Sequence, residues 1–236
     1  MREKILFDNN WYFHRGDVKT DYPVTKGPVY TMAKTERMKM GPASRYYDID
    51  VEGYNYTGEI KGEKWEITDL PHDYVITQTP SAQYNETLGF FKYENAWYRK
   101  DFECTSEDLQ KRITLYFEGV ATHATVYLNG SIICRNYCGY TPFTADISDY
   151  VCEGKNVLAV YVDATTSHEG WWYEGAGIYR HVWLIKTDKI AIDTWGVYVH
   201  PEKKDGTIWS VPVETTVLND TNNLADVKVN HTIKDS

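Results

Sequence analysis

The chain of 236 residues contains no apolar run near the ~20 residues that a membrane-spanning helix requires. It also lacks positive charge: 25 Lys and Arg residues face 34 Asp and Glu residues, which gives a formal charge of −9. No basic stripe interrupts this acidity, so we expect neither a nucleic-acid nor a membrane partner. Residues 1–7 lack the apolar core of a signal peptide. A cytoplasmic and a periplasmic or secreted bacterial location both stay open.

Cysteine is scarce, and its spacing argues against a metal centre. No Cys-x-x-Cys pair and no Cys/His ligand spacing joins the four residues Cys104, Cys134, Cys138 and Cys152. We expect reduced, partly buried thiols, no metal and no cofactor. His72 and His181 have no second ligand at coordination spacing and are expected to be solvated or hydrogen-bonded.

Aromatic residues are abundant, with 20 Tyr and 8 Trp, and aromatics favour strands. No segment shows a convincing helical period, whereas short alternating runs follow one another closely. Asn129-Gly130 between two apolar runs predicts a tight hairpin. We expect strands at 96–103, 112–118, 143–148, 156–162 and 181–186, and two strands around Asn129-Gly130 within 124–133. This spacing is typical of an all-β sandwich or barrel.

A second β-pattern follows the first near residue 188. We expect three strands, at 190–199, 207–218 and 225–233. An immunoglobulin-like sandwich needs about seven, so we expect this domain to continue past Ser236. Such a half sandwich exposes its inner face. The predicted division is a first domain over 1–187 and the N-terminal part of an immunoglobulin-like β-sandwich over 188–236.

The most informative stretch is the sequence Trp-Trp-Tyr-Glu-Gly-Ala-Gly-Ile-Tyr-Arg, residues 171–180. Aromatic faces bind the C–H faces of sugars, glycines allow close backbone approach, and arginine supplies fixed donors. These residue types suit a carbohydrate site. They equally suit a well-packed loop between strands.

Four ordered motifs carry a resemblance to a known family: 97–102 (WYRKDF), 126–130 (VYLNG), 139–147 (GYTPFTADI) and 175–184 (GAGIYRHVWL), with WEITDLPHD at 65–73 before them. Over about residues 5–186 the chain resembles the N-terminal sugar-binding jelly-roll domain of glycoside hydrolase family 2, the family of β-galactosidases and β-glucuronidases. The resemblance implies an immunoglobulin-like domain next, and then a TIM barrel whose two glutamates hydrolyse β-glycosides with retention.

The barrel and its glutamates are not in this chain, so we expect no catalytic residue here. None of the acidic residues lies in a motif that would bring two carboxylates face to face, and we expect solvated or turn roles for Asp73, Glu118, Asp146, Glu169 and Glu174. The predicted function is a non-catalytic part of a retaining β-glycosidase that supports the barrel and shapes its substrate pocket. The partners would be a carbohydrate and that barrel, and a homo-oligomer is compatible. The alternatives are a stand-alone, lectin-like carbohydrate-binding module and a structural or oligomerisation domain.

The resemblance also implies substrate-binding candidates, namely Asn85, Trp171, Trp172 and Tyr173. Asn85 lies nearest to a sugar-contacting asparagine of some family members, and an Asx turn is the local alternative. Trp171 stands where those galactosidases carry an aspartate, so galactose specificity is not inherited. We expect Trp172 and Tyr173 to be buried anchors, with Trp171 alone near the sugar. Gly175, Gly177 and Arg180 would hold the loop, with Arg180 forked onto a carboxylate or carbonyls.

Overall fold

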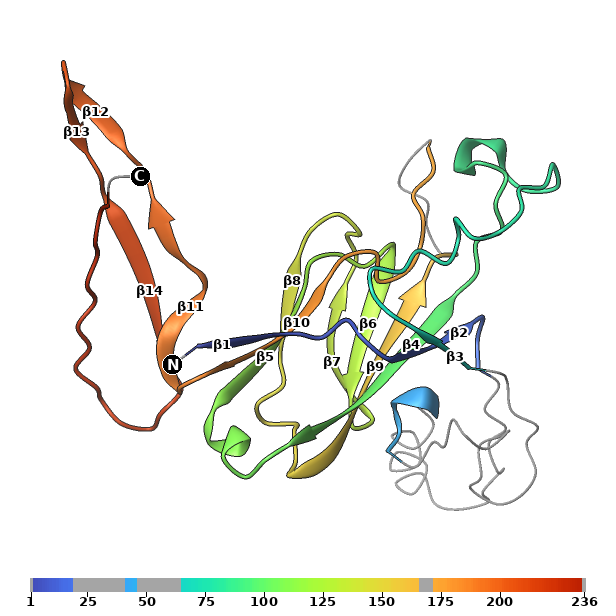
Figure 1. Cartoon of the computed structure of the whole chain (residues 1–236), viewed down its shortest axis with the longest axis horizontal. Coiled ribbons are helices and arrows are strands. Elements are labelled where there is room, and N and C mark those ends of the chain that lie inside the picture. Colours follow the sequence, from blue (N-terminus) through green and yellow to red (C-terminus); the bar gives the residue numbers. More distant parts are fainter. Residues whose placement is uncertain (1, 19–40, 46–64, 166–171, 235–236) are drawn as a thin grey trace, which may run out of the picture.

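Two antiparallel sheets form the larger part of the molecule (Figure 1), which the computed structural model describes over residues 2–18, 41–45, 65–165 and 172–234. The six-stranded sheet has the order β3 (Glu66–Thr68), β2 (Trp11–Arg15), β4 (Ala96–Cys104), β9 (Gly154–Asp163), β6 (His123–Leu128), β7 (Ser131–Asn136). The four-stranded sheet has the order β1 (Glu3–Leu6), β10 (Val182–Thr187), β5 (Arg112–Phe117), β8 (Phe143–Asp146). The prediction of an all-β jelly-roll sandwich is confirmed.

Helix is confined to three short 3-10 turns in the described residues, η1 (Gly41–Ala43), η2 (Glu86–Leu88) and η3 (Asp108–Gln110). Within the same residues, no helix has the length and apolarity needed to cross a bilayer.

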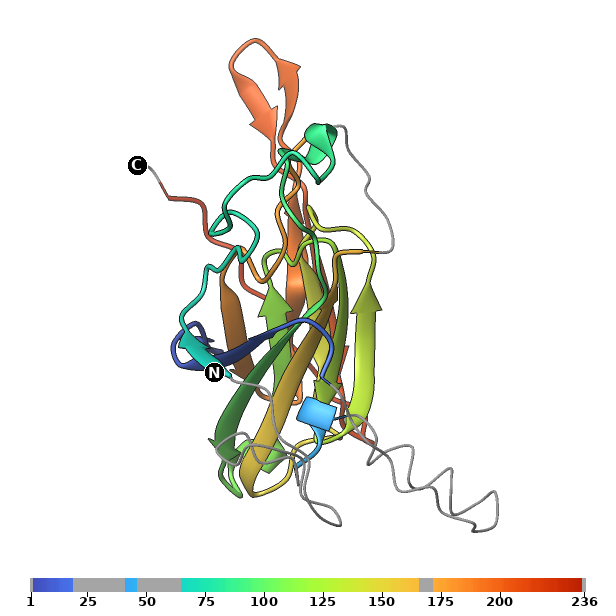
Figure 2. The same cartoon turned by 90° about the vertical axis from the view of Figure 1, so that its right-hand side faces the viewer.

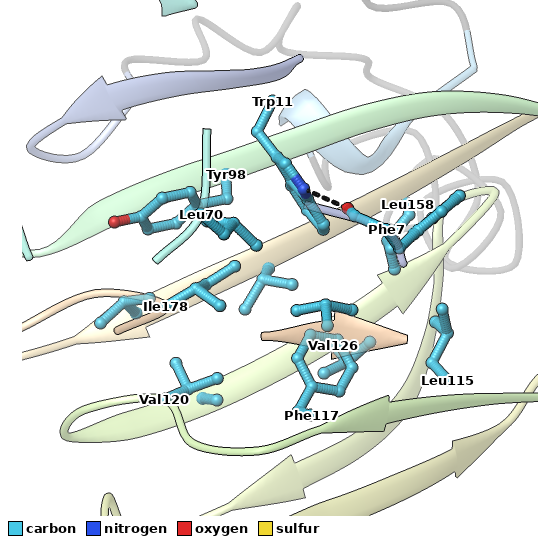
Figure 3. Close-up of a cluster of buried hydrophobic side chains, with 14 of the residues drawn as sticks. Phe7, Trp11, Leu70, Tyr98, Leu115, Phe117, Val120, Val126, Leu158 and Ile178 are labelled. Carbon is cyan, nitrogen blue, oxygen red and sulfur yellow. Dashed lines mark hydrogen bonds between the residues drawn. The ribbon is translucent and has the colours of Figure 1, made fainter. Parts of the chain in front are cut away.

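The core lies between the two sheets (Figure 3). Leu115 and Phe117 of β5 face it from one side, and Val126 and Leu158 from the other, all with no exposed surface. Each such side chain stabilises the fold by about 1.5–3 kcal/mol on burial. The indole Nε1 of Trp11 donates to the backbone carbonyl of Phe7 at 2.8 Å, as polar atoms in a core require.

The hairpin between β6 and β7 turns at Asn129 and Gly130, as predicted. Their φ angles are +50° and +85°, the left-handed region that a type I′ turn needs at both central positions. The Asn129 side chain also accepts from the Val157 amide at 3.0 Å and donates to the Tyr150 carbonyl at 3.0 Å. The turn is thereby fastened to the neighbouring strand β9.

The four cysteines are free thiols that are buried or partly buried, as expected. Cys104 is 2% exposed in the core. Burial raises the pKa of the Cys134 thiol to about 11, which keeps it protonated near neutral pH.

The second β-part contains β11 (Ile190–Val199), β12 (Glu202–Asp205), β13 (Ile208–Ser210) and β14 (Val213–Asn219). β11 pairs with β14, and β12 with β13, in two separate two-stranded ladders (Figure 1). The single strand predicted at 207–218 is split around Pro212, which has no amide to donate to a ladder.

The prediction of a strand at 225–233 is wrong, because the structure has no strand there. Val227 and Ile233 are 53% and 78% exposed, so their apolar alternation has no sheet to pack on. Trp195 and Tyr198 of β11 are also largely exposed. The assignment of residues 188–236 to an immunoglobulin-like domain stays a prediction.

Arg112 links the two β-parts. Its guanidinium pairs with Asp146 of β8 at 2.9 Å and also with Asp220, just after β14. Beside it, the ring of Tyr116 on β5 meets Trp195 of β11 edge to face, with centroids 5.6 Å apart. Charge pairing and aromatic contact therefore fix the second part against β5 and β8.

Candidate functional site

Four connections gather at one end of the sandwich (Figures 1 and 2): those between β3 and β4, β5 and β6, β7 and β8, and β9 and β10. The segment 172–180 lies between two of the others. The His72 amide donates to the Ile178 carbonyl at 2.8 Å, while Ala121 and Gly177 exchange backbone hydrogen bonds of 3.0 and 2.8 Å. The segment is therefore held from both sides by backbone.

Gly175 and Gly177 make this close approach possible. Their φ angles are +71° and +130°, which L side chains rarely adopt. A Cβ on Gly175 would lie 2.6 Å from an oxygen of Asp73, and one on Gly177 would lie 2.4 Å from the His72 carbonyl oxygen. Both positions need glycine, in agreement with the crowded turn that the sequence predicts.

Asp73 is the centre of the loop cluster. Its Oδ2 accepts from the Tyr173 hydroxyl at 2.6 Å, and its Oδ1 accepts from the amides of Val75 at 2.9 Å and Ala176 at 3.2 Å. Burial and the bond to this carboxylate raise the pKa of Tyr173, so its hydroxyl stays protonated. Asp73 is thus a turn residue, as expected, and also the fastening point of Tyr173. Sequence reasoning missed this second role, although the Leu-Pro-His-Asp motif at 70–73 could have indicated it.

Tyr93 supplies a second fastening. Its hydroxyl oxygen accepts from the amides of Glu174 at 3.3 Å and Gly175 at 3.2 Å. Burial raises the pKa of Tyr93, which keeps this phenol neutral. The ring of Tyr173 meets Phe91 edge to face with centroids 5.5 Å apart. Tyr173 is therefore an anchored and partly buried side chain. A contact between Tyr173 and a sugar stays a prediction.

Trp172 is not buried, so that expectation is wrong. It is 56% exposed, and its Nε1 donates at 3.0 Å to the hydroxyl of Tyr140, which is itself 50% exposed. The reason is that Tyr173 occupies the inward position of the loop and Trp172 precedes it on the outward side. Trp171 lies outside the described residues.

Asn85 is the N-cap of η2. Its Oδ1 accepts from the amide of Thr87 at 2.9 Å and from the Thr87 hydroxyl at 2.8 Å. This is the Asx-type arrangement that the sequence left as the alternative. A contact between Asn85 and a sugar stays a prediction.

Arg180 is exposed, and its guanidinium lies over the ring of Tyr179, 5.2 Å from the centroid. The Tyr179 hydroxyl in turn donates to the Gly139 carbonyl at 2.8 Å. Besides the backbone bonds given above, the side chains that hold the loop are those of Asp73, Tyr93 and Tyr179. The expected fork of Arg180 onto a carboxylate or carbonyls is not seen among the described residues. Arg180 stacks on the aromatic ring next to it.

The two histidines are hydrogen-bonded, as expected. His72 Nδ1 lies 2.8 Å from the Tyr98 hydroxyl, and His181 Nδ1 lies 2.6 Å from Asp8. Burial lowers the pKa of His72. Across the described residues, no group of three or more His, Cys, Asp or Glu side chains is arranged to hold a metal ion.

Three of the acidic residues considered above have structural partners. Glu118 accepts from the Trp183 indole at 2.8 Å, Asp146 pairs with Arg112, and Asp73 holds the loop. Glu169 lies outside the described residues.

The fold and the loop cluster define the class of the protein: an antiparallel jelly-roll β-sandwich that carries aromatic side chains on the loops at one end, followed by a smaller β-part. The family described as glycosyl hydrolase 2 galactose-binding domain-like matches residues 58–181, more than half of the chain. The chain belongs to this family.

Relatives and solved structures agree with this assignment. The chain is 35% identical over 176 residues to the β-galactosidase BoGH2A of Bacteroides ovatus, and this match covers 73% of the chain and 21% of that enzyme. It is 28% identical over 185 residues to a β-glucuronidase of Formosa agariphila, covering 66% of the chain and 18% of that enzyme. A β-glycosidase structure from Bacteroides vulgatus superposes with a TM-score of 0.74 at 27% identity, covering 94% of this chain and 25% of that one. The chain thus spans about a fifth to a quarter of these relatives.

Proposed function

We propose that this chain is the non-catalytic N-terminal portion of a retaining β-glycosidase, where it supports the catalytic barrel and shapes the substrate pocket. The observation that carries the proposal is the rigid segment 172–180, whose aromatic end is fastened by Asp73 and Tyr93 at the loop end of the jelly roll. Family membership and the β-galactosidase and β-glucuronidase names of the relatives support the reaction class.

The chemistry of the described residues supports a binding role rather than a reacting one. Retaining hydrolysis needs two carboxyl groups about 5–5.5 Å apart, flanking one glycosidic bond. Asp73 accepts three hydrogen bonds of 3.2 Å or less from its own loop cluster, so it serves as a structural acceptor. A fixed aromatic loop instead positions a substrate by lowering the entropy that is lost on binding.

The test compares the 236-residue chain with the longer protein that would carry it. We expect the longer protein to hydrolyse p-nitrophenyl β-galactoside or β-glucuronide and the chain alone to hydrolyse neither. In the longer protein, Asp73→Ala should lower kcat/KM by roughly 10- to 100-fold, because loosening a positioning loop displaces the substrate. The matched control is Asp205→Ala in the exposed strand β12, which should leave kcat/KM unchanged.

Both variants are assayed at a temperature where circular dichroism shows them folded, so that loss of fold is not read as loss of function. Hydrolysis by the chain alone would overturn the non-catalytic assignment. Absence of any β-glycosidase activity in the longer protein, together with sugar binding by the chain, would favour the lectin-like alternative.

A further inference from the structure

Trp172 and Tyr140 come from different connections and meet on the surface at the loop end. They are 56% and 50% exposed, and the indole Nε1 donates to the Tyr140 hydroxyl oxygen at 3.0 Å. This bond satisfies the one polar atom of Trp172. Much of both rings nevertheless remains at the surface, where their apolar area is not stabilised by packing.

Each member of the pair is next in sequence to a fixed residue. Trp172 precedes Tyr173, which is bonded to Asp73 at 2.6 Å. Tyr140 follows Gly139, whose carbonyl accepts from the Tyr179 hydroxyl at 2.8 Å. The two rings are therefore preorganised by the loops beneath them, and a ligand would not have to order them on binding.

The pair also offers a directed hydrogen bond. The Tyr140 oxygen accepts from Trp172 and keeps its own proton, because a phenol is both acceptor and donor. In the described parts of the chain that proton has no acceptor beside it. An apolar ring face with a hydroxyl donor at its edge is complementary to a pyranose, which has C–H groups on its faces and hydroxyl acceptors around its rim.

We propose that Trp172 and Tyr140 form a stacking subsite for a pyranose ring, with the Tyr140 hydroxyl donating to a sugar hydroxyl. This inference rests on the proposed function, since it takes carbohydrate to be the ligand of the loop end. It adds Tyr140, which was not among the predicted site residues, and it gives the substrate-binding candidate Trp172 an exposed ring face and a named neighbour.

The test uses the 236-residue chain labelled with 15N at its 8 tryptophans. Indole NMR signals are followed while methyl β-galactopyranoside, methyl β-glucopyranoside or sorbitol is added to about 100 mM, which covers millimolar affinities. Trp172→Phe assigns the Trp172 signal. We expect that signal to shift saturably with at least one glycoside. Sorbitol, an acyclic polyol with no ring face, should not shift it.

Three variants test which side chains contribute to glycoside binding. The Kd of each variant is measured from its remaining indole signals and by calorimetry. Trp172→Ala should weaken the apparent Kd about tenfold or more, and Tyr140→Phe, which keeps the ring and loses the hydroxyl, by about three- to tenfold. The matched control is Trp209→Ala in β13, a tryptophan 57% exposed far from the loop end, which should leave the Kd unchanged.

A Trp172 signal that stays still with both glycosides would overturn the subsite, as would a glycoside Kd that Trp172→Ala leaves unchanged. This failure is distinguishable from failure of the proposed function, which is read from hydrolysis by the longer protein. If the longer protein is active but the 236-residue chain shows no Trp172 response, the subsite alone is refuted. Saturable binding at Trp172 with an inactive longer protein refutes the glycosidase assignment alone.

Discussion

Gly177→Ala tests how tightly the loop cluster is packed. The new Cβ would lie 2.4 Å from the His72 carbonyl oxygen and 2.5 Å from the Tyr98 hydroxyl oxygen. Neither atom can retreat easily, because Tyr98 is fully buried and His72 is bonded through its backbone to Ile178. The paired hydrogen bonds with Ala121 also prevent Gly177 itself from moving.

The loss in the free energy of unfolding that we expect for Gly177→Ala has two contributions. A non-glycine residue at φ +130° costs about 1–3 kcal/mol of backbone strain. Overpacking against buried neighbours costs about 1–3 kcal/mol more. The two contributions together give a destabilisation of about 2–6 kcal/mol. At about 2–4 °C per kcal/mol for a domain of this size, Tm should fall by roughly 4–24 °C.

Gly16→Ala is the matched control, because Gly16 has φ +92° but no described atom lies within 4 Å of the position that its Cβ would take. It should show the strain contribution alone, about 1–3 kcal/mol. Both free energies of unfolding are measured by urea titration with circular dichroism and tryptophan fluorescence. Equal losses for the two variants would refute the tight packing at Gly177.

Three further predictions concern bonds described above. Tyr173→Phe removes the hydroxyl that donates to Asp73 and should cost about 1.5–3 kcal/mol, whereas Tyr137→Phe, at a residue 62% exposed, should cost almost nothing in the same melt. The lowered pKa of His72 means that the folded state binds fewer protons than the unfolded state just below pH 6.5. The free energy of unfolding should therefore fall as the pH falls through that value. His72→Gln should flatten this part of the stability profile, and an unchanged slope would contradict the assignment to His72. Arg112→Ala removes the charge bridge between the two β-parts and should broaden the distance distribution between spin labels placed on each. An unchanged distribution would contradict a role of Arg112 in holding the two parts together.

Much of the fold could be predicted because it follows from local patterns. The strand β5 alternates in the sequence as it does in the sheet, and Asn129-Gly130 encodes its own turn through left-handed backbone angles. The strand predicted at 225–233 failed because alternation only becomes a strand when another strand accepts its hydrogen bonds, and the described residues provide none there.

The candidate site was less predictable. The sequence identified the segment 171–180 through its aromatics and glycines, but it assigned the inward and outward roles within that segment incorrectly at Trp172. It also treated Asp73 as a local turn residue, although its main partner, Tyr173, is a hundred residues away. Side-chain direction in a loop depends on such distant partners, which local periodicity does not encode.

By itself, the sequence determined the all-β class, the hairpin at Asn129, the need for glycine at 175 and 177, and the family, since each depends on residue type and local spacing. Only the tertiary structure decided that Asp73 fastens the loop and that Trp172 meets Tyr140 at the surface. The physical reason is that these contacts join separate connections, and their geometry exists only once both sheets have packed and brought the loop ends together.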